Sequence, residues 1–237
     1  MSESKKYFQF GLTHNFACNY LPEQQERLVV VTNSEDITNE NYQRLLMAGF
    51  RRSGNQVYRP HCIDCNSCES IRLPVHQFKP SKSQKRIIST NKDLTIKISL
   101  EADERYFDLY QRYINTVHQD GSMFPANKEQ YKGFIFNELI DQLFIEIYHG
   151  KQLVSVAVCD NLPNSLSALY TFYDPDHSKR SLGKYSILTQ IQVAKSLNKN
   201  YLYLGYQIDD CQKMNYKKSY YPHERLIQDQ WIHINKS

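Results

Sequence analysis

The chain has 237 residues, 41% of them hydrophobic and 23% charged, and its 29 basic and 25 acidic residues give a net charge of +4. A chain of this length can bury a substantial core in one domain or two modest ones, and so mild a charge permits a local RNA-binding patch but argues against a dedicated nucleic-acid binder. No apolar run approaches the roughly 18 residues of a membrane span, and the first residues carry no secretory apolar segment, so we expect a cytoplasmic protein.

The N-terminal half is predicted to contain a helix, a hairpin, a cysteine-rich loop, a second helix and a strand. Residues 39–49 show helical spacing and end at a glycine, and residues 50–58 predict a hairpin. The S-x-x-Q pattern of Ser81 and Gln84 is a capping box that opens a basic helix. Alternating apolar residues over 94–100 predict a half-buried strand.

Beyond residue 100 the pattern changes to two helices, three strands, a helix and a strand. The expected ranges, in chain order, are 101–118, 127–139, 142–149, 152–160, 165–174, 183–197 and 201–205. Short turns between the three strands favour an antiparallel meander. This order is that of the GNAT-like α/β (α+β) acyltransferase fold. We therefore expect a smaller cysteine-containing domain over 1–98 and a GNAT-like domain over 99–237.

The loop that enters the last long helix tests which acyl donor such a domain would use. Acetyl-CoA-dependent GNAT enzymes carry [QR]-x-x-G-x-[GA], whose small residues let backbone amides hold a pyrophosphate at the helix N-terminus. This chain keeps Arg180 and Gly183, but Tyr185 occupies the final small position. The bulky ring disfavours acetyl-CoA, so we expect the fold with a different acyl donor.

Three cysteines at i, i+3 and i+6 indicate a metal or redox site. Cys62, Cys65 and Cys68 need a fourth ligand for a closed tetrahedral site, and Cys18 or His61 could supply it. Zinc is one candidate, and the spacing also matches the first three ligands of a bacterial iron–sulfur motif. The third alternative is a set of reduced, unliganded thiols.

Arginines and a polar loop supply further candidate site residues. Arg72 lies inside an apolar run next to the cysteines, and Arg86 lies in the basic helix; either could grip a carboxylate, or the basic residues could form a solvated face. The strand 201–205 runs into a loop that contains Asp209 and Asp210. Polar side chains that follow a buried strand are typical of a site on a rigid scaffold.

Short segments in a fixed order extend over nearly the whole chain: 18–22, 49–54, 58–60 with the cysteine loop, 81–86, 109–113, 170–173, 181–183, 204–206 and 213–217. Together they resemble the bacterial aspartate/glutamate leucyltransferases, relatives of the eukaryotic arginyl-tRNA–protein transferases. The eukaryotic relatives carry C-x2-C near the N-terminus, whereas this chain has Leu21 at the second position. The additional Cys62 could compensate.

The resemblance implies transfer of leucine from leucyl-tRNA to the α-amine of a protein that begins with Asp or Glu, which marks the product for N-degron proteolysis. It also implies that residues 99–237 form an aminoacyltransferase domain. The ester is already activated and the amine is partly neutral at cellular pH, so alignment supplies much of the rate. We expect no cofactor in the chemistry, and zinc or an iron–sulfur cluster only as a structural group.

Site roles follow as hypotheses. Arg72 or Arg86 would bind the acceptor carboxylate, so charge reversal at the residue concerned should abolish transfer to Asp-starting peptides. Tyr170 and Tyr206 would line the substrate pocket. Asp209 or Asp210 would be the catalytic group that orients the α-ammonium. The tRNA acceptor end would contact four lysines: Lys184, Lys213, Lys217 and Lys218.

Two alternatives stay open from the residues alone. One is arginyl transfer from arginyl-tRNA to the same acceptors, because no residue pattern distinguishes the two donor side chains. The other is a non-enzymatic, metal-binding RNA-interaction module that uses the basic N-terminal half.

Overall fold

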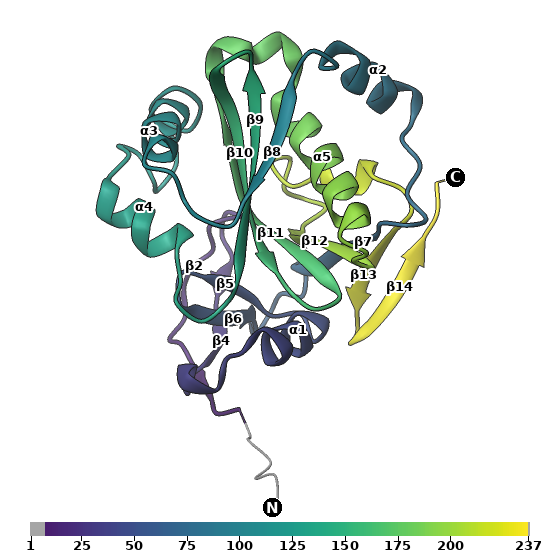
Figure 1. Ribbon diagram of the computed structural model, residues 1–237. Coiled ribbons are helices and arrows are strands. Elements are labelled where there is room, and N and C mark those ends of the chain that lie inside the picture. The colour runs from purple at the N-terminus through teal and green to yellow at the C-terminus, as the bar shows by residue number, and fades with distance from the viewer. Residues whose placement is uncertain (1–7, 237) are drawn as a thin grey trace, which may run out of the picture.

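The computed structural model describes residues 8–236, and its centre is an eight-stranded mixed sheet with helices on both faces (Figure 1). In spatial order the strands are β14 (Gln230–Ile234), β13 (His223–Ile227), β7 (Glu69–Pro74), β12 (Tyr201–Gln207), β11 (Ser165–Tyr173), β10 (Gln152–Asn161), β9 (Gln142–His149) and β8 (Thr95–Ser99). The meander of β9, β10 and β11 is antiparallel and confirms the predicted pairing. The predicted α/β acyltransferase-type fold is confirmed.

A smaller sheet and one helix pack against the large sheet. The strand order is β1 (Phe10–Leu12), β4 (Leu28–Val31), β6 (Gln56–Pro60) and β5 (Arg51–Ser53), and β2 (Phe16–Ala17) pairs with β3 (Gln25–Glu26). Helix α1 (Asn39–Met47) and the hairpin of β5 and β6 confirm the two N-terminal predictions. Tyr42 and Leu46 of α1 join one apolar cluster with Tyr203 of β12, so the smaller sheet has a fixed position against the larger one.

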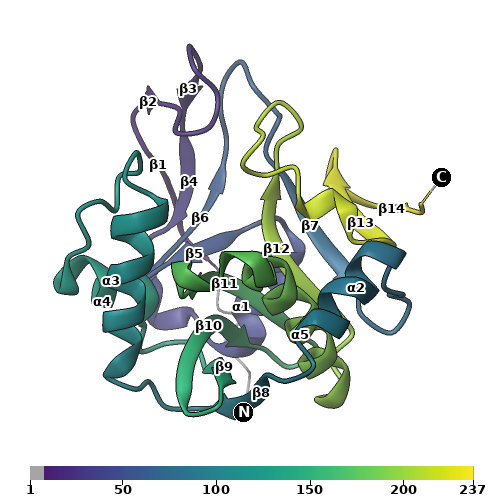
Figure 2. The ribbon, with the colours of Figure 1, turned by 90° about the horizontal axis from the view of Figure 1, so that it is seen from above.

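The remaining helices cover the two faces of the large sheet. They are α2 (Lys82–Thr90), α3 (Arg105–Val117), α4 (Lys128–Ile135) and α5 (Leu182–Ser196), with 3-10 turns η1 (Ser34–Asp36), η2 (Pro175–Arg180) and η3 (Lys217–Ser219). Figure 2 shows α3 and α4 on one side of the sheet and α5 with α2 on the other. Among residues 8–236, no helix is long and apolar enough to cross a bilayer.

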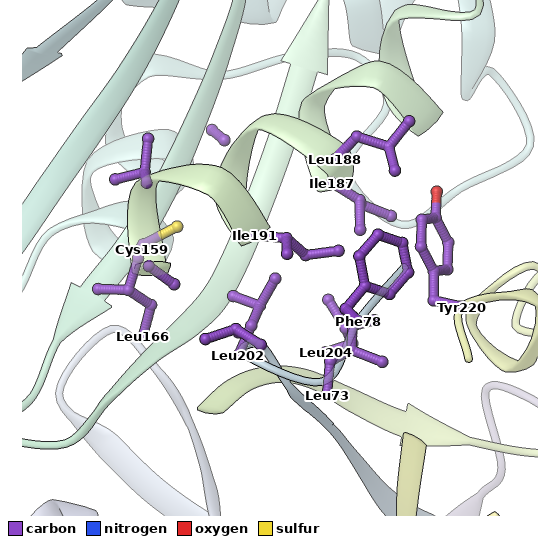
Figure 3. Packing of buried hydrophobic residues seen from close by; sticks show 14 of the residues in the cluster. Leu73, Phe78, Cys159, Leu166, Ile187, Leu188, Ile191, Leu202, Leu204 and Tyr220 are labelled. Atoms are coloured by element: carbon purple, nitrogen blue, oxygen red, sulfur yellow. The ribbon is translucent and has the colours of Figure 1, made fainter. Parts of the chain in front are cut away.

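Alternation along β10 explains why both faces carry helices. Ala157 points toward the cluster around Ile191 of α5, whereas Val156 points toward the cluster around Tyr110 of α3. Successive side chains of a strand face opposite sides of a sheet, so one apolar strand serves two cores. Figure 3 shows the α5 side, where Ile191 lies over Leu202 of β12.

The strand predicted over 94–100 forms, but the prediction that it is half-buried is wrong for most of it. β8 is the edge strand of the large sheet and pairs only with β9. Ile96 and Ile98, at this sheet edge, are 43% and 41% exposed. Lys97, on the other side of the strand, forms an ion pair with the buried Glu146 at 3.4 Å.

The capping box at the start of α2 is confirmed. The Ser81 side chain accepts from the Gln84 amide at 3.3 Å, and the Gln84 side chain accepts from the Ser81 amide at 2.8 Å. Replacing Ser81 with alanine should lower the free energy of unfolding by about 1 kcal/mol in urea titrations. Ser89→Ala, at an exposed position of the same helix, should change it by less than about 0.5 kcal/mol. Equal effects of the two substitutions would contradict the capping role.

The division of the chain at residue 98 stays a prediction. Strand β7 precedes that position and β8 spans it, and both are hydrogen-bonded into the large sheet. β7 pairs with β12 on one side and with β13 on the other. Residues of the N-terminal part therefore form part of the sheet that carries the site.

Strands β11 and β12 open the large sheet. They pair in parallel only from Ser165–Tyr201 to Ser167–Tyr203, and no further pairs follow along the two strands. Beyond that point the register of β12 against β7 shifts between Tyr203 and Tyr206. The two strands therefore part toward their C-terminal ends and leave room for a cavity.

Candidate active site

A cavity of about 1020 Å³ lies where β11 and β12 part. The N-terminal turn of α5, the end of α3 and the loops before α4 and after β12 complete its wall. The cavity is large enough for an aminoacyl group together with the first residue of a peptide.

One wall of the cavity is aromatic and apolar. Tyr113 of α3 packs on Tyr173 of β11 with ring centroids 4.7 Å apart, and Phe134 of α4 packs on Tyr170 at 5.3 Å. Burial raises the pKa of Tyr113 and of Tyr170, so both phenols are neutral at cellular pH. Tyr170, which the sequence predicts to line the pocket, lies in this wall.

Another part of the wall is cationic. Five Lys or Arg side chains line the cavity: Arg51, Arg52, Lys184, Lys213 and Lys217. No Asp or Glu lines it within the described residues. Two of the five cations form ion pairs with acidic residues outside the cavity lining: Arg52 with the buried Asp160, and Lys213 with Asp120 at 2.8 Å. The cavity therefore presents an excess of positive charge.

Among residues 8–236, Arg51 and Lys217 are the buried cations without an acidic partner. Arg51 is 7% exposed; its Nη2 donates to the Ala168 carbonyl at 3.0 Å, and its Nη1 has no hydrogen-bond partner. Lys217 is 5% exposed, and its Nζ donates to the Tyr206 carbonyl at 2.5 Å. Burial, and then the charge of Arg51, lower the pKa of Lys217 to about 7. The sequence predicts Lys217 as a tRNA contact, but its side chain lies inside the protein.

Other predicted site residues also reach the cavity. Tyr206 lines it, and its hydroxyl donates to the Gly49 carbonyl at 2.9 Å. Burial raises the pKa of Tyr206 well above its usual value. Lys184 and Lys213 line the cavity from exposed positions, where they can meet a nucleic acid.

Arg72 lies outside the cavity, and its charge is already paired. Its Nε donates to Glu224 at 2.7 Å, and its guanidinium lies between the rings of Tyr201 and Trp231, 3.9 and 4.0 Å from their centroids. These contacts tie β7 to β12, β13 and β14. Arg86 lies on the exposed side of α2, also outside the cavity. We therefore assign the acceptor carboxylate to neither residue.

The two predicted catalytic carboxylates also lie away from the cavity. Asp209 accepts from Arg225 at 2.8 Å, and this hydrogen bond is the largest cause of its lowered pKa. The half-buried Lys218 pairs with Asp209 at 3.4 Å. Asp210 is exposed in the turn that follows, and neither Asp lines the cavity. Their catalytic role stays a prediction without geometric support.

The four candidate metal ligands lie near one another beside the cavity. Burial, and then the charges of Cys62, Cys18 and Cys65, raise the pKa of Cys68 to about 12. The Tyr20 amide donates to the Cys18 sulfur at 3.4 Å, and the Tyr20 side chain lines the cavity. Within residues 8–236, however, no three His, Cys, Asp or Glu side chains form a group that could hold a metal ion. The thiols as placed do not fit a closed metal site, and metal binding stays a prediction.

A mixed sheet that opens between two parallel strands, beside the N-terminus of a long helix and over an aromatic and cationic cavity, defines a GNAT-like acyltransferase. Two family models match the chain: "Arginine-tRNA-protein transferase, N terminus" over residues 16–86 and "Arginine-tRNA-protein transferase, C terminus" over residues 105–227. The chain belongs to this family of aminoacyltransferases, in the branch of the aspartate/glutamate leucyltransferases, and the resemblance drawn from the sequence is confirmed.

Curated relatives place the chain in this branch. The aspartate/glutamate leucyltransferase of Pseudoalteromonas atlantica is 51% identical over 228 residues, which cover 96% of this chain and 98% of the relative. That of Aeromonas hydrophila is 48% identical over 225 residues, 95% and 94% of the two chains. Among solved structures the chain is similar to FemX, with 8% identity, coverage of 87% and 81%, and a TM-score of 0.47.

Proposed function

We propose that the protein transfers leucine from leucyl-tRNA to the α-amine of proteins that begin with Asp or Glu. The observation that carries this proposal is the character of the cavity, which joins an aromatic wall to buried cations and has no Asp or Glu among its described lining residues. An apolar aminoacyl group suits the wall, and an acidic acceptor residue suits the cations.

The same observation favours leucyl over arginyl transfer. An arginine side chain in this cavity would add a third guanidinium beside Arg51 and Arg52, and no carboxylate lines the described cavity to receive it. Unpaired like charges in a desolvated site discriminate strongly against a ligand. The relatives that cover nearly the whole chain carry the leucyl name.

The reaction balances without an external reductant or energy source. The acceptor amine attacks the carbonyl carbon of the aminoacyl ester, the new C–N amide bond forms, and the C–O bond to the terminal ribose breaks. The amine loses a proton and the ribose hydroxyl gains one. Because the ester is activated and the amine has a pKa of about 7.7–8.0, holding the two in line can supply much of the rate.

The exposed lysines Lys184 and Lys213 would contact the tRNA acceptor end at the cavity wall. Phosphate contacts of this kind give affinity that falls with salt and carries no sequence information. From the charged-tRNA donor we infer a reaction in the cytoplasm, and the product would expose an N-terminal leucine that marks it for N-degron proteolysis.

The test is transfer from leucyl-tRNA and arginyl-tRNA, each radiolabelled, to a protein that begins with Asp. We expect acid-stable label from leucyl-tRNA only. Label from arginyl-tRNA alone would make the protein an arginyltransferase. If neither charged tRNA gave label although the protein bound RNA, the non-enzymatic RNA-interaction module would be the better description.

Charge reversal at Arg86 is expected to leave leucyl transfer within about twofold of wild type, because an exposed side chain outside the cavity makes no substrate contact. The check is the initial rate with an Asp-starting peptide for Arg86→Glu beside the wild-type protein. A tenfold or larger loss of the initial rate would support the original prediction that Arg86 of α2 binds the acceptor carboxylate.

A further inference from the structure

Two neighbouring arginines of β5, Arg51 and Arg52, are both buried, but only Arg52 has an acidic partner among the described residues. Arg52 points to the buried Asp160, with Nε to Oδ1 at 2.8 Å. Arg51 lines the same cavity but has no acidic partner within residues 8–236, although it is as inaccessible as a core residue. A buried charge without a partner is destabilising, so its retention calls for an explanation outside folding.

Gly205 leaves open the space in front of this charge. A Cβ placed on Gly205 would lie 3.7 Å from Nη2 of Arg51 and 3.8 Å from Nζ of Lys217. The two cations therefore border one point in the cavity, which no side chain occupies. Gly205 has a φ of +84°, a conformation that suits glycine and keeps this point free.

A carboxylate fits this point better than a phosphate. Both cations are less than a tenth exposed, so the anion must be carried by a short side chain that enters the cavity. The first residue of an Asp- or Glu-starting acceptor has such a side chain. Its carboxylate can accept charge-assisted hydrogen bonds from a guanidinium and a neighbouring ammonium. A tRNA phosphodiester is bulkier and is tied on both sides to its chain, so it suits the exposed lysines instead.

On the basis of the proposed function, we propose that Arg51, together with Lys217, binds the side-chain carboxylate of the first residue of the acceptor and so sets the preference for Asp and Glu. The backbone at Gly205 forms the third side of the subsite. Arg51 is then the residue that distinguishes an acidic acceptor from its amide analogue.

The experiment compares acceptor peptides that begin with Asp, Asn, Glu or Gln in wild-type protein, Arg51→Gln and Arg51→Lys. We expect Arg51→Gln to lose about 100-fold or more in kcat/KM for the Asp peptide, and its Asp-to-Asn ratio to fall to within about threefold of one. Arg51→Lys should recover part of the preference, because it keeps a positive charge. Arg86→Gln, at an exposed arginine, should keep the wild-type ratio.

Two further readouts, leucyl-tRNA binding and the melting temperature, separate the explanations. Arg51→Gln should bind leucyl-tRNA within about twofold of wild type and, as it removes an unpaired buried charge, should melt no lower than wild type. An unchanged Asp-to-Asn ratio in folded Arg51→Gln overturns the proposal. If the same variant also bound leucyl-tRNA more weakly, the anion at this point would be a tRNA phosphate. If Arg51→Gln does not fold, the ratio in Arg51→Lys decides. Failure of the wild-type protein to transfer leucine at all would instead refute the proposed function.

Discussion

Replacing Asp160 with asparagine is expected to lower the free energy of unfolding by about 3–5 kcal/mol, because it leaves a buried guanidinium without its counter-charge. Asp160 has no exposed surface, and its Oδ1 accepts from both Nε and Nη2 of Arg52. Arg52 also donates to the Gly54 carbonyl at 3.0 Å, which fixes the turn between β5 and β6. The ion pair joins the smaller sheet to β10 of the larger one and so holds the neighbouring Arg51 in the cavity.

Urea unfolding followed by tyrosine and tryptophan fluorescence measures this effect. Asp176→Asn is the matched control, since Asp176 is 82% exposed and pairs with Arg112 at 2.9 Å on the surface. An exposed pair of this kind contributes at most about 1 kcal/mol. Equal stabilities of the two variants would show that the buried pair does not join the sheets as described.

Local sequence signals predicted the elements whose partners are near in the chain. The meander from β9 to β11 follows from alternating apolar residues and two short turns. Strands β7, β13 and β14 were not predicted, because their pairing is non-local: Arg72 of β7 lies opposite Glu224 of β13, 152 residues later. No short-range sequence pattern predicts the pairing of strands so far apart in the chain. In the sequence, β7 is recognisable only as an apolar run after the cysteines.

The same distinction explains the candidate site. Tyr170 lies in β11, Tyr206 lies in β12 and Lys217 follows β12. They line the cavity because the sequence located both strands correctly. Arg72 was singled out because it interrupts an apolar run, but its partners come from the end of the chain and satisfy it. The sequence does not single out Arg51, because it shows two adjacent arginines and does not show which of them forms an ion pair with a distant acidic residue.

Replacing Lys217 with methionine is expected to lower kcat/KM for Asp-starting acceptors by about 30-fold or more at pH 7 and to change the pH profile. The pKa of Lys217 is lowered to about 7, so its charged fraction is high below that pH and falls above it. Carboxylate binding favours the charged form. The acceptor amine acts in the opposite sense, because its reactive neutral fraction grows up to its own pKa of about 7.7–8.0.

The wild-type profile of kcat/KM should therefore rise toward pH 7, pass through a maximum between about pH 7 and 8, and fall at higher pH, since this parameter reports the free enzyme and free substrate. In Lys217→Met the descending limb should vanish, leaving a rise that levels off above the pKa of the amine. Initial rates from pH 6 to 9, corrected for spontaneous hydrolysis of leucyl-tRNA, measure both profiles. Lys218→Met, at the neighbouring lysine that lies outside the cavity and pairs with Asp209, should keep the wild-type shape. A descending limb that persists in Lys217→Met would assign it to another group and leave Arg51 as the only cation of the subsite.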